Sequence, residues 1–80
     1  MGDVRIEFTI EPFVDGNPGP HVLAAWRAIE AHGCELDAGP FSSTVDVAAG
    51  RAHELVSDLV EAAFANGATR VAVQVEQHEP

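Results

Sequence analysis

The sequence predicts an α+β fold in which a four-stranded antiparallel sheet carries two helices on one of its faces. Two segments space their apolar residues as a helix does, and four segments carry them at every second position. These segments follow one another in the order strand, helix, strand, strand, helix, strand. Because each strand has only one apolar side, we expect both helices to cover the same face of the sheet.

The first strand is predicted over residues 4–11, where apolar and polar residues alternate. Its apolar side is formed by Val4, Ile6, Phe8 and Ile10. The turn-rich stretch "PFVDGNPGP", residues 12–20, ends the strand. Its last residue, Pro20, suits the first position of a helix, where the missing N–H costs nothing.

The first helix is predicted to begin at Pro20 and to end near Gly33. Its apolar stripe is formed by Val22, Ala25, Trp26 and Ile29. The second helix is predicted to begin at Ala52 and to stop at Asn66-Gly67. Its broader stripe is formed by Ala52, Leu55, Val56, Leu59, Val60, Ala63 and Phe64.

The remaining strands are shorter or lie after turns. The stretch "CELD", residues 34–37, alternates as a strand does, and a tight turn at residues 38–40 follows it. In "GPFSSTVDV", residues 39–47, Val45 and Val47 continue an apolar side while Thr44 and Asp46 point the other way. The stretch "TRVAVQVEQ", residues 69–77, alternates again. The resulting order is the ferredoxin-like plan, with the first and third strands side by side in the centre.

Composition narrows the classes of function. The 80 residues, taken as one domain over 1–80, hold 13 acidic and 4 basic residues, for a net charge of −9. Nucleic acids and polyphosphates need clustered positive charge, so we expect neither as a partner.

No apolar run is long enough to span a membrane, and the start of the chain lacks a signal peptide's basic region. With Cys34 alone no disulfide within the chain can form, and we expect a cytoplasmic protein. A chain this short has a small core, which favours oligomers.

The face of the sheet away from the helices is predicted to be open, acidic and rich in hydroxyl groups. Its central strands would present Glu7, Thr9 and Glu11 next to Ser42, Thr44 and Asp46. The edge strands would add Glu35 and Asp37 on one side and Gln74 and Glu76 on the other. Hydroxyls and carboxylates so arranged can bind a polar, positively charged small molecule. The alternative is a solvated or assembly face whose serines and threonines are simply strand residues.

Three stretches carry a family resemblance in their order along the chain: "FTIEP", "GPFSSTVD" and "EAAFANGATRVAVQVE". Together they resemble the YkoF-like thiamine-binding family, small cytoplasmic proteins also associated with the thiamine precursor hydroxymethylpyrimidine. The resemblance spans nearly the whole chain. It implies a non-catalytic protein that binds thiamine or hydroxymethylpyrimidine, with no cofactor beyond that ligand. It also implies ferredoxin-like subunits that pair through their sheets into homodimers or homotetramers.

The resemblance places the site on particular positions. Thr9 stands where the family has a strand-end serine, Ser43 and Thr44 match its paired hydroxyls, and Asp46 stands for its glutamate. Ser42 replaces a frequent glycine, and the family's basic tail is missing. The predicted ligand-binding residues are Thr9, Glu11, Phe41, Ser42, Ser43, Thr44 and Asp46.

The chemistry of these residues suits thiamine. A thiazolium ring carries a fixed positive charge that Glu7, Glu11 or Asp46 would favour, and an aminopyrimidine offers donors and acceptors to hydroxyls. Phe41 or Phe13 would stack on a ring, although Phe13 suits local packing equally well. The shortage of basic residues favours unphosphorylated thiamine or the free pyrimidine over the diphosphate.

The remaining histidine, cysteine and loop residues indicate neither a catalytic site nor a metal site. The histidines, at positions 21, 32, 53 and 78, show no ligand spacing and are interpreted as solvated surface residues. Cys34 is interpreted as a small buried hydrophobe. The loop before the first helix lacks the arginine that an acylphosphatase needs to bind phosphate. The alternative to ligand binding is an interaction module, whose open face serves oligomer assembly or a protein partner.

Overall fold

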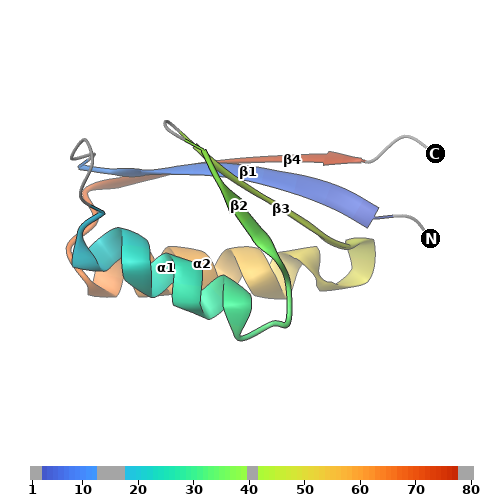
Figure 1. Ribbon diagram of the computed structural model, residues 1–80, viewed down its shortest axis with the longest axis horizontal. Helices are drawn as coiled ribbons and strands as arrows, with labels where there is room; N and C mark the ends of the chain where they lie inside the picture. Colours follow the sequence, from blue (N-terminus) through green and yellow to red (C-terminus); the bar gives the residue numbers. More distant parts are fainter. Residues whose placement is uncertain (1–2, 13–17, 40–41, 78–80) are drawn as a thin grey trace.

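The computed structural model describes residues 3–12, 18–39 and 42–77. Its strands form one antiparallel sheet in the order β2-β3-β1-β4, and both helices lie on the same side of that sheet (Figure 1). The elements are β1 (Asp3–Glu11), α1 (Pro20–Glu30), β2 (Leu36–Ala38), β3 (Ser43–Ala48), the 3-10 helix η1 (Ala49–Arg51), α2 (Ala52–Ala65) and β4 (Arg70–Gln77). The predicted ferredoxin-like fold is confirmed, with β1 and β3 in the centre.

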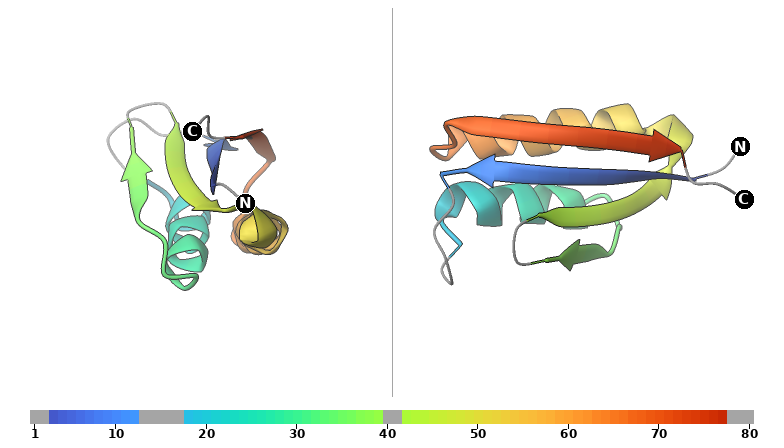
Figure 2. Two further views of the ribbon diagram at one scale, coloured as in Figure 1. Left: turned by 90° about the vertical axis from the view of Figure 1, so that its right-hand side faces the viewer. Right: turned by 90° about the horizontal axis from the view of Figure 1, so that it is seen from above.

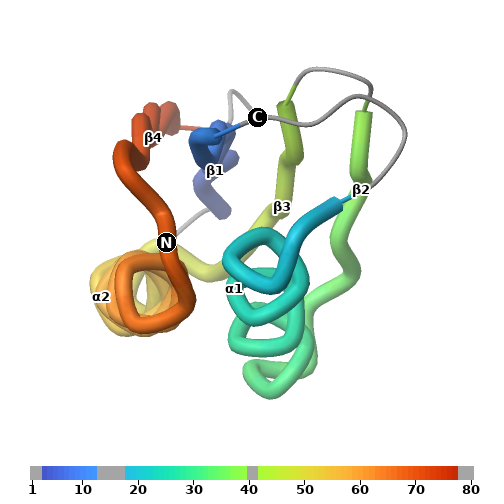
Figure 3. The backbone as a smooth tube through the Cα atoms, turned by 90° about the vertical axis from the view of Figure 1, so that its left-hand side faces the viewer, coloured from blue at the N-terminus to red at the C-terminus, as the bar shows by residue number. Residues whose placement is uncertain are grey.

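The two edges of the sheet differ in length. Strand β4 has 8 residues and pairs with β1 over its whole length, from Arg70 opposite Glu11 to Gln77 opposite Val4 (Figure 2, right). Strand β2 has only 3 residues, which pair with β3. The sequence predicted this strand over 34–37, whereas the structure begins it at Leu36. Cys34 and Glu35 instead carry the chain from the helix layer up to the sheet (Figure 3).

Both helices begin and end where the sequence places their signals. Pro20 occupies the first turn of α1, and the Gly19 carbonyl accepts hydrogen bonds from the N–H groups of Val22 and Leu23. After α1 and α2 the chain turns at Gly33 and Gly67, whose φ angles are +76° and +104°. Only glycine adopts this region without strain, so these two residues end the helices cleanly.

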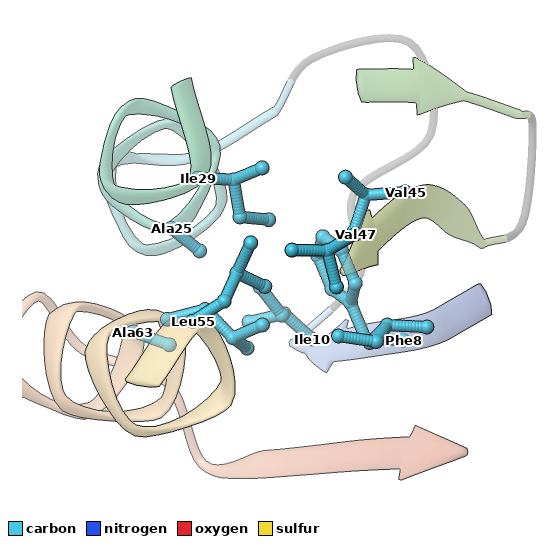
Figure 4. Close-up of a cluster of buried hydrophobic side chains, with 10 residues drawn as sticks. Phe8, Ile10, Ala25, Ile29, Val45, Val47, Leu55 and Ala63 are labelled. Atoms are coloured by element: carbon cyan, nitrogen blue, oxygen red, sulfur yellow. The ribbon is translucent and has the colours of Figure 1, made fainter. Parts of the chain in front are cut away.

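The core lies between the helix layer and the inner face of the sheet (Figure 4). It is formed by Ile6, Phe8, Ile10, Ala25, Ile29, Val45, Val47, Leu55, Leu59 and Ala63. These are the alternate residues of the two central strands and the helical stripes that the sequence predicts. Cys34 is half-buried and packs against this cluster.

Two side chains depart from the sequence-based interpretation. His21 is 6% exposed, and its Nε2–H donates to the Pro12 carbonyl at 2.7 Å, so it is not a solvated surface residue. His32 donates to the Asp58 carboxylate at 2.7 Å and so connects the end of α1 to α2. Both histidines bind to residues in other segments, 9 and 26 positions away along the chain, which local spacing does not reveal.

Phe64 is the exception in the apolar stripe of α2, because its side chain is 51% exposed. Asp58 marks the side of α2 that faces α1, through its contact with His32. At 100° per residue, Val56, Val60 and Phe64 lie on the opposite flank of the helix. Figure 3 shows that α2 lies beneath β4, with α1 on its other side. Phe64 therefore points toward the outer side of the molecule rather than into the core.

Candidate ligand-binding face

The candidate site is the open face, defined as the side of the sheet away from the two helices (Figures 1 and 3). Strand alternation places on it the residues Arg5, Glu7, Thr9, Glu11, Asp37, Thr44, Asp46, Arg70, Ala72, Gln74 and Glu76. Both predicted features, the acidity and the hydroxyl groups, are present on this face. Its composition follows from the period of two in β1 and β3, whose other side forms the core.

Thr44 lies in a polar row that crosses the whole sheet. In β1 it faces Glu7, in β2 it faces Asp37, and Glu7 in turn faces Gln74 of β4. Directly opposed residues of an antiparallel pair have their Cβ atoms about 4.5–5.5 Å apart. The half-buried Thr44 thus lies between two acidic residues, Glu7 and Asp37.

Ser42 joins this row from the end of β3. Its hydroxyl donates to Glu7 Oε2 at 2.9 Å, which shows that Ser42 is turned toward the open face. Continuing the register between β1 and β3 by one residue places Ser42 beside Thr9. Three of the predicted hydroxyl residues, Thr9, Ser42 and Thr44, therefore lie near Glu7 on the open face.

Two other predicted carboxylates are engaged by arginines. Asp46 accepts from Arg5 through two contacts, Nε to Oδ1 at 3.0 Å and Nη2 to Oδ2 at 3.4 Å. This hydrogen bond raises the pKa of Arg5 above its usual value, with smaller contributions from the charges of Glu76 and Asp37. Glu11 accepts from Arg70 at 3.4 Å. Neither pair is predicted by the sequence pattern, although Arg5 and Glu7 lie on the same side of β1.

Ser43 lies on the other side of the sheet. Its side chain is 7% exposed, and its hydroxyl accepts a hydrogen bond from the indole N–H of Trp26 at 3.2 Å. It lies opposite Phe8 of β1 and so belongs to the packed layer between the sheet and the helices. The structure thus separates Ser43 from Ser42 and Thr44. Phe41, and Phe13 with it, lie outside the described residues.

A shallow hollow borders the open face at its β2 edge. Its volume is about 450 Å³, and it is lined by Glu35, Leu36, Asp37 and Asp46. Asp37 belongs both to this hollow and to the row of Thr44. The hollow therefore extends the polar row toward the sheet edge and adds further negative charge to it.

Neither a metal centre nor an acid–base pair stands out in the described part of the chain. Residues 3–12, 18–39 and 42–77 contain no group of three histidine, cysteine or carboxylate side chains able to hold a metal ion. The side chains of the open face suit hydrogen bonding and the attraction of a cation. Within the same residues, neither α1 nor α2 has the length and apolarity needed to cross a membrane.

Three solved structures resemble this chain. A domain of unknown function DUF77 from Bacillus cereus superposes with a TM-score of 0.70 at 18% identity, over 99% of this chain and 77% of that one. A Thermotoga maritima protein, provisionally assigned to thiamine biosynthesis or salvage, gives 0.62 at 17% identity, over 98% and 84%. A Streptococcus pneumoniae protein gives 0.58 at 16% identity, over 98% and 87%. The shared fold is established.

Sequence comparison adds nothing to this likeness. No protein-family model matches the chain, and no curated protein matches it. Two of these neighbours, a DUF77 domain and a protein provisionally assigned to thiamine biosynthesis or salvage, are consistent with the resemblance to the YkoF-like family. At these identities the likeness extends to the fold alone.

Proposed function

We propose that this protein binds thiamine or its hydroxymethylpyrimidine precursor on the open face and does not transform it. The observation that carries the proposal is the hydrogen bond from the Ser42 hydroxyl to the Glu7 carboxylate, with Thr44 opposite Glu7 and Thr9 next to Ser42 on the same face. An aminopyrimidine has an amino group that donates and ring nitrogens that accept. Carboxylates and hydroxyls side by side are suitable partners for both.

Charge supports the choice of ligand. The thiazolium ring of thiamine is a permanent cation, and Asp37, Glu35 and Asp46 line the hollow next to the Thr44 row. The two arginines of the open face already form ion pairs with Asp46 and Glu11, so neither is available to bind a diphosphate. We therefore expect thiamine and the free pyrimidine to bind more tightly than thiamine diphosphate. We also propose that the protein binds this ligand in the cytoplasm, as a subunit of a homodimer or homotetramer.

Isothermal titration tests this directly. Thiamine, hydroxymethylpyrimidine and thiamine diphosphate are titrated into protein shown by mass spectrometry to be free of ligand. We expect saturable binding of thiamine or the pyrimidine, and a loss of about tenfold in affinity in Thr44→Val, because one hydrogen bond in the site disappears. Thr69→Val, an exposed threonine just before β4, is the matched control and should bind as the parent does.

The opposite outcomes are equally informative. If none of the three ligands gives heat or thermal stabilisation, the binding proposal is wrong, and the open face serves assembly or a protein partner instead. If a ligand binds but Thr44→Val and Thr69→Val bind equally well, the ligand occupies another part of the molecule. Tighter binding of the diphosphate would contradict the charge argument alone.

A further inference from the structure

Three carboxylates of the open face differ in their hydrogen-bond partners. Asp46 and Glu11 each accept from an arginine. Glu7 instead accepts from the neutral hydroxyl of Ser42 at 2.9 Å. An arginine offsets the charge of the carboxylate that it contacts, whereas a hydroxyl leaves that charge in place. Of these three carboxylates, Glu7 is therefore the best suited to accept a further hydrogen bond from a ligand.

The same hydrogen bond fixes what Ser42 can offer to a ligand. A serine hydroxyl has one proton and two lone pairs. Because that proton is directed to Glu7 Oε2, the Ser42 oxygen has only lone pairs left. An ionised carboxylate is likewise an acceptor and has no proton to donate. The two side chains together, called the Ser42–Glu7 pair from here on, therefore accept hydrogen bonds from a ligand and donate none to it.

The backbone holds both members of the pair in place. The Ser42 carbonyl accepts from the Gly39 N–H at 2.8 Å, and the next residue begins β3. A Cβ atom at Gly39 would lie only 3.0 Å from the Ser42 carbonyl oxygen, so glycine permits this close approach. Glu7 lies within β1, which pairs with β3 on one side and with β4 on the other. Both side chains therefore extend from fixed positions.

We propose that the Ser42–Glu7 pair selects a hydrogen-bond donor: it binds an amino group of the ligand and excludes a carbonyl oxygen from the same position. This inference rests on the proposed function and names the part of the ligand that the site recognises. In thiamine and in hydroxymethylpyrimidine that part is the amino group at C4 of the pyrimidine ring. Its N–H donates to the Glu7 carboxylate in a charge-assisted hydrogen bond. An oxo group at C4 would instead set its lone pairs against those of the pair.

Thr44 is a less selective partner for the same edge of the ring. It lies opposite Glu7 on the open face, and its hydroxyl can either donate or accept. It can therefore donate to the unprotonated ring nitrogen beside the amino group. In the 4-oxo ring that nitrogen carries a proton, and the Thr44 hydroxyl can turn to accept from it. The Ser42–Glu7 pair has no proton to turn toward the oxo group, so the pair decides between the two rings.

Matched pairs of ligands test this selection. Thiamine is compared with oxythiamine, its 4-oxo analogue, and hydroxymethylpyrimidine with its own 4-oxo analogue, all by isothermal titration. We expect the parent protein to bind each amino compound at least about tenfold more tightly than its oxo partner, because a hydrogen bond to a charged group is lost. The second pair of ligands contains no thiazolium ring. A ratio shared by both pairs therefore arises at the pyrimidine.

Variants of the protein assign this ratio to the Ser42–Glu7 pair. Glu7→Gln replaces a carboxylate oxygen by an N–H donor, so the amino-to-oxo ratio should fall to about one or reverse. Glu61→Gln, an exposed change of equal charge on α2, should keep the ratio of the parent. Ser42→Ala should weaken thiamine binding about three- to tenfold, because the carboxylate loses its hydrogen bond. Ser42→Thr keeps the hydroxyl and should bind as the parent does. Circular dichroism confirms that each variant is folded.

The outcomes separate this inference from the proposed function. If no compound of either pair binds, the proposed function is wrong and this inference is wrong with it. If thiamine and oxythiamine bind equally well, ligand binding stands, but the selection of a donor is overturned. The inference is also overturned if Glu7→Gln keeps the same ratio as Glu61→Gln, or if Ser42→Thr binds thiamine as weakly as Ser42→Ala.

Discussion

Leu59→Ala should lower the free energy of unfolding by about 3 kcal/mol, within the 2–5 kcal/mol typical of deleting a buried leucine. Leu59 is fully buried between α2, α1 and the inner face of the sheet, so truncation leaves a cavity that neighbours cannot fill. A domain of this size has a total stability on the order of 4–12 kcal/mol. The melting temperature should fall by roughly 12–24 °C, at about 4–8 °C per kcal/mol.

Leu23→Ala is the matched control for this experiment. Leu23 is the same residue type in a helix, but it is half-buried and does not pack against the core cluster. Thermal and urea unfolding followed by circular dichroism should give a loss well below that of Leu59→Ala. Both proteins should be measured at several concentrations, because self-association adds to apparent stability. Equal losses in the two variants would contradict the assignment of Leu59 to the centre of the core.

Trp26→Phe should lower the free energy of unfolding by about 1–3 kcal/mol, the cost of leaving a buried polar group without its partner. Phenylalanine keeps most of the ring packing but removes the N–H that donates to Ser43 Oγ at 3.2 Å. Ser43 is only 7% exposed, so water cannot readily replace that donor. Ser43→Ala should cost less, about 1 kcal/mol, because Trp26 is only half-buried and water can more easily replace the lost partner.

A double-mutant cycle isolates this hydrogen bond. The combined variant Trp26→Phe with Ser43→Ala should be more stable than the sum of the two single losses predicts, by about 1 kcal/mol. Urea unfolding monitored by far-UV circular dichroism avoids the loss of the tryptophan signal. Strict additivity would show that the two side chains do not interact. Ser43→Ala should also retain ligand affinity, in contrast to its neighbour Thr44→Val, because the two hydroxyls lie on opposite faces.

The sequence predicts the elements of this fold well because each carries its own local signal. Pro20 and Gly33 bracket α1, Asn66-Gly67 ends α2, and alternation in β1 separates Ile6 from Glu7. The exception is β2, whose three residues carry too little pattern to be located by themselves. Its pairing with β3 decides its limits, and that pairing is a tertiary contact.

The site is predicted only in part, for an equally physical reason. Alternation correctly places Thr9, Thr44 and Asp46 on the open face, and the same rule places Ser43 with Val45 on the buried side. The resemblance to paired hydroxyls led us to group Ser43 with Thr44, against that rule. Contacts such as Arg5 with Asp46, or His21 with the Pro12 carbonyl, depend on how distant segments meet. The spacing of residues in the sequence therefore does not predict these contacts.

The brevity of β2 limits what this edge of the sheet can offer to another polypeptide. Strand β2 has 3 residues and ends the sheet on one side. Such an edge offers an added strand only a few backbone groups, next to the carboxylates of Glu35 and Asp37. The β2 edge is therefore protected against the unwanted strand pairing that leads to aggregation.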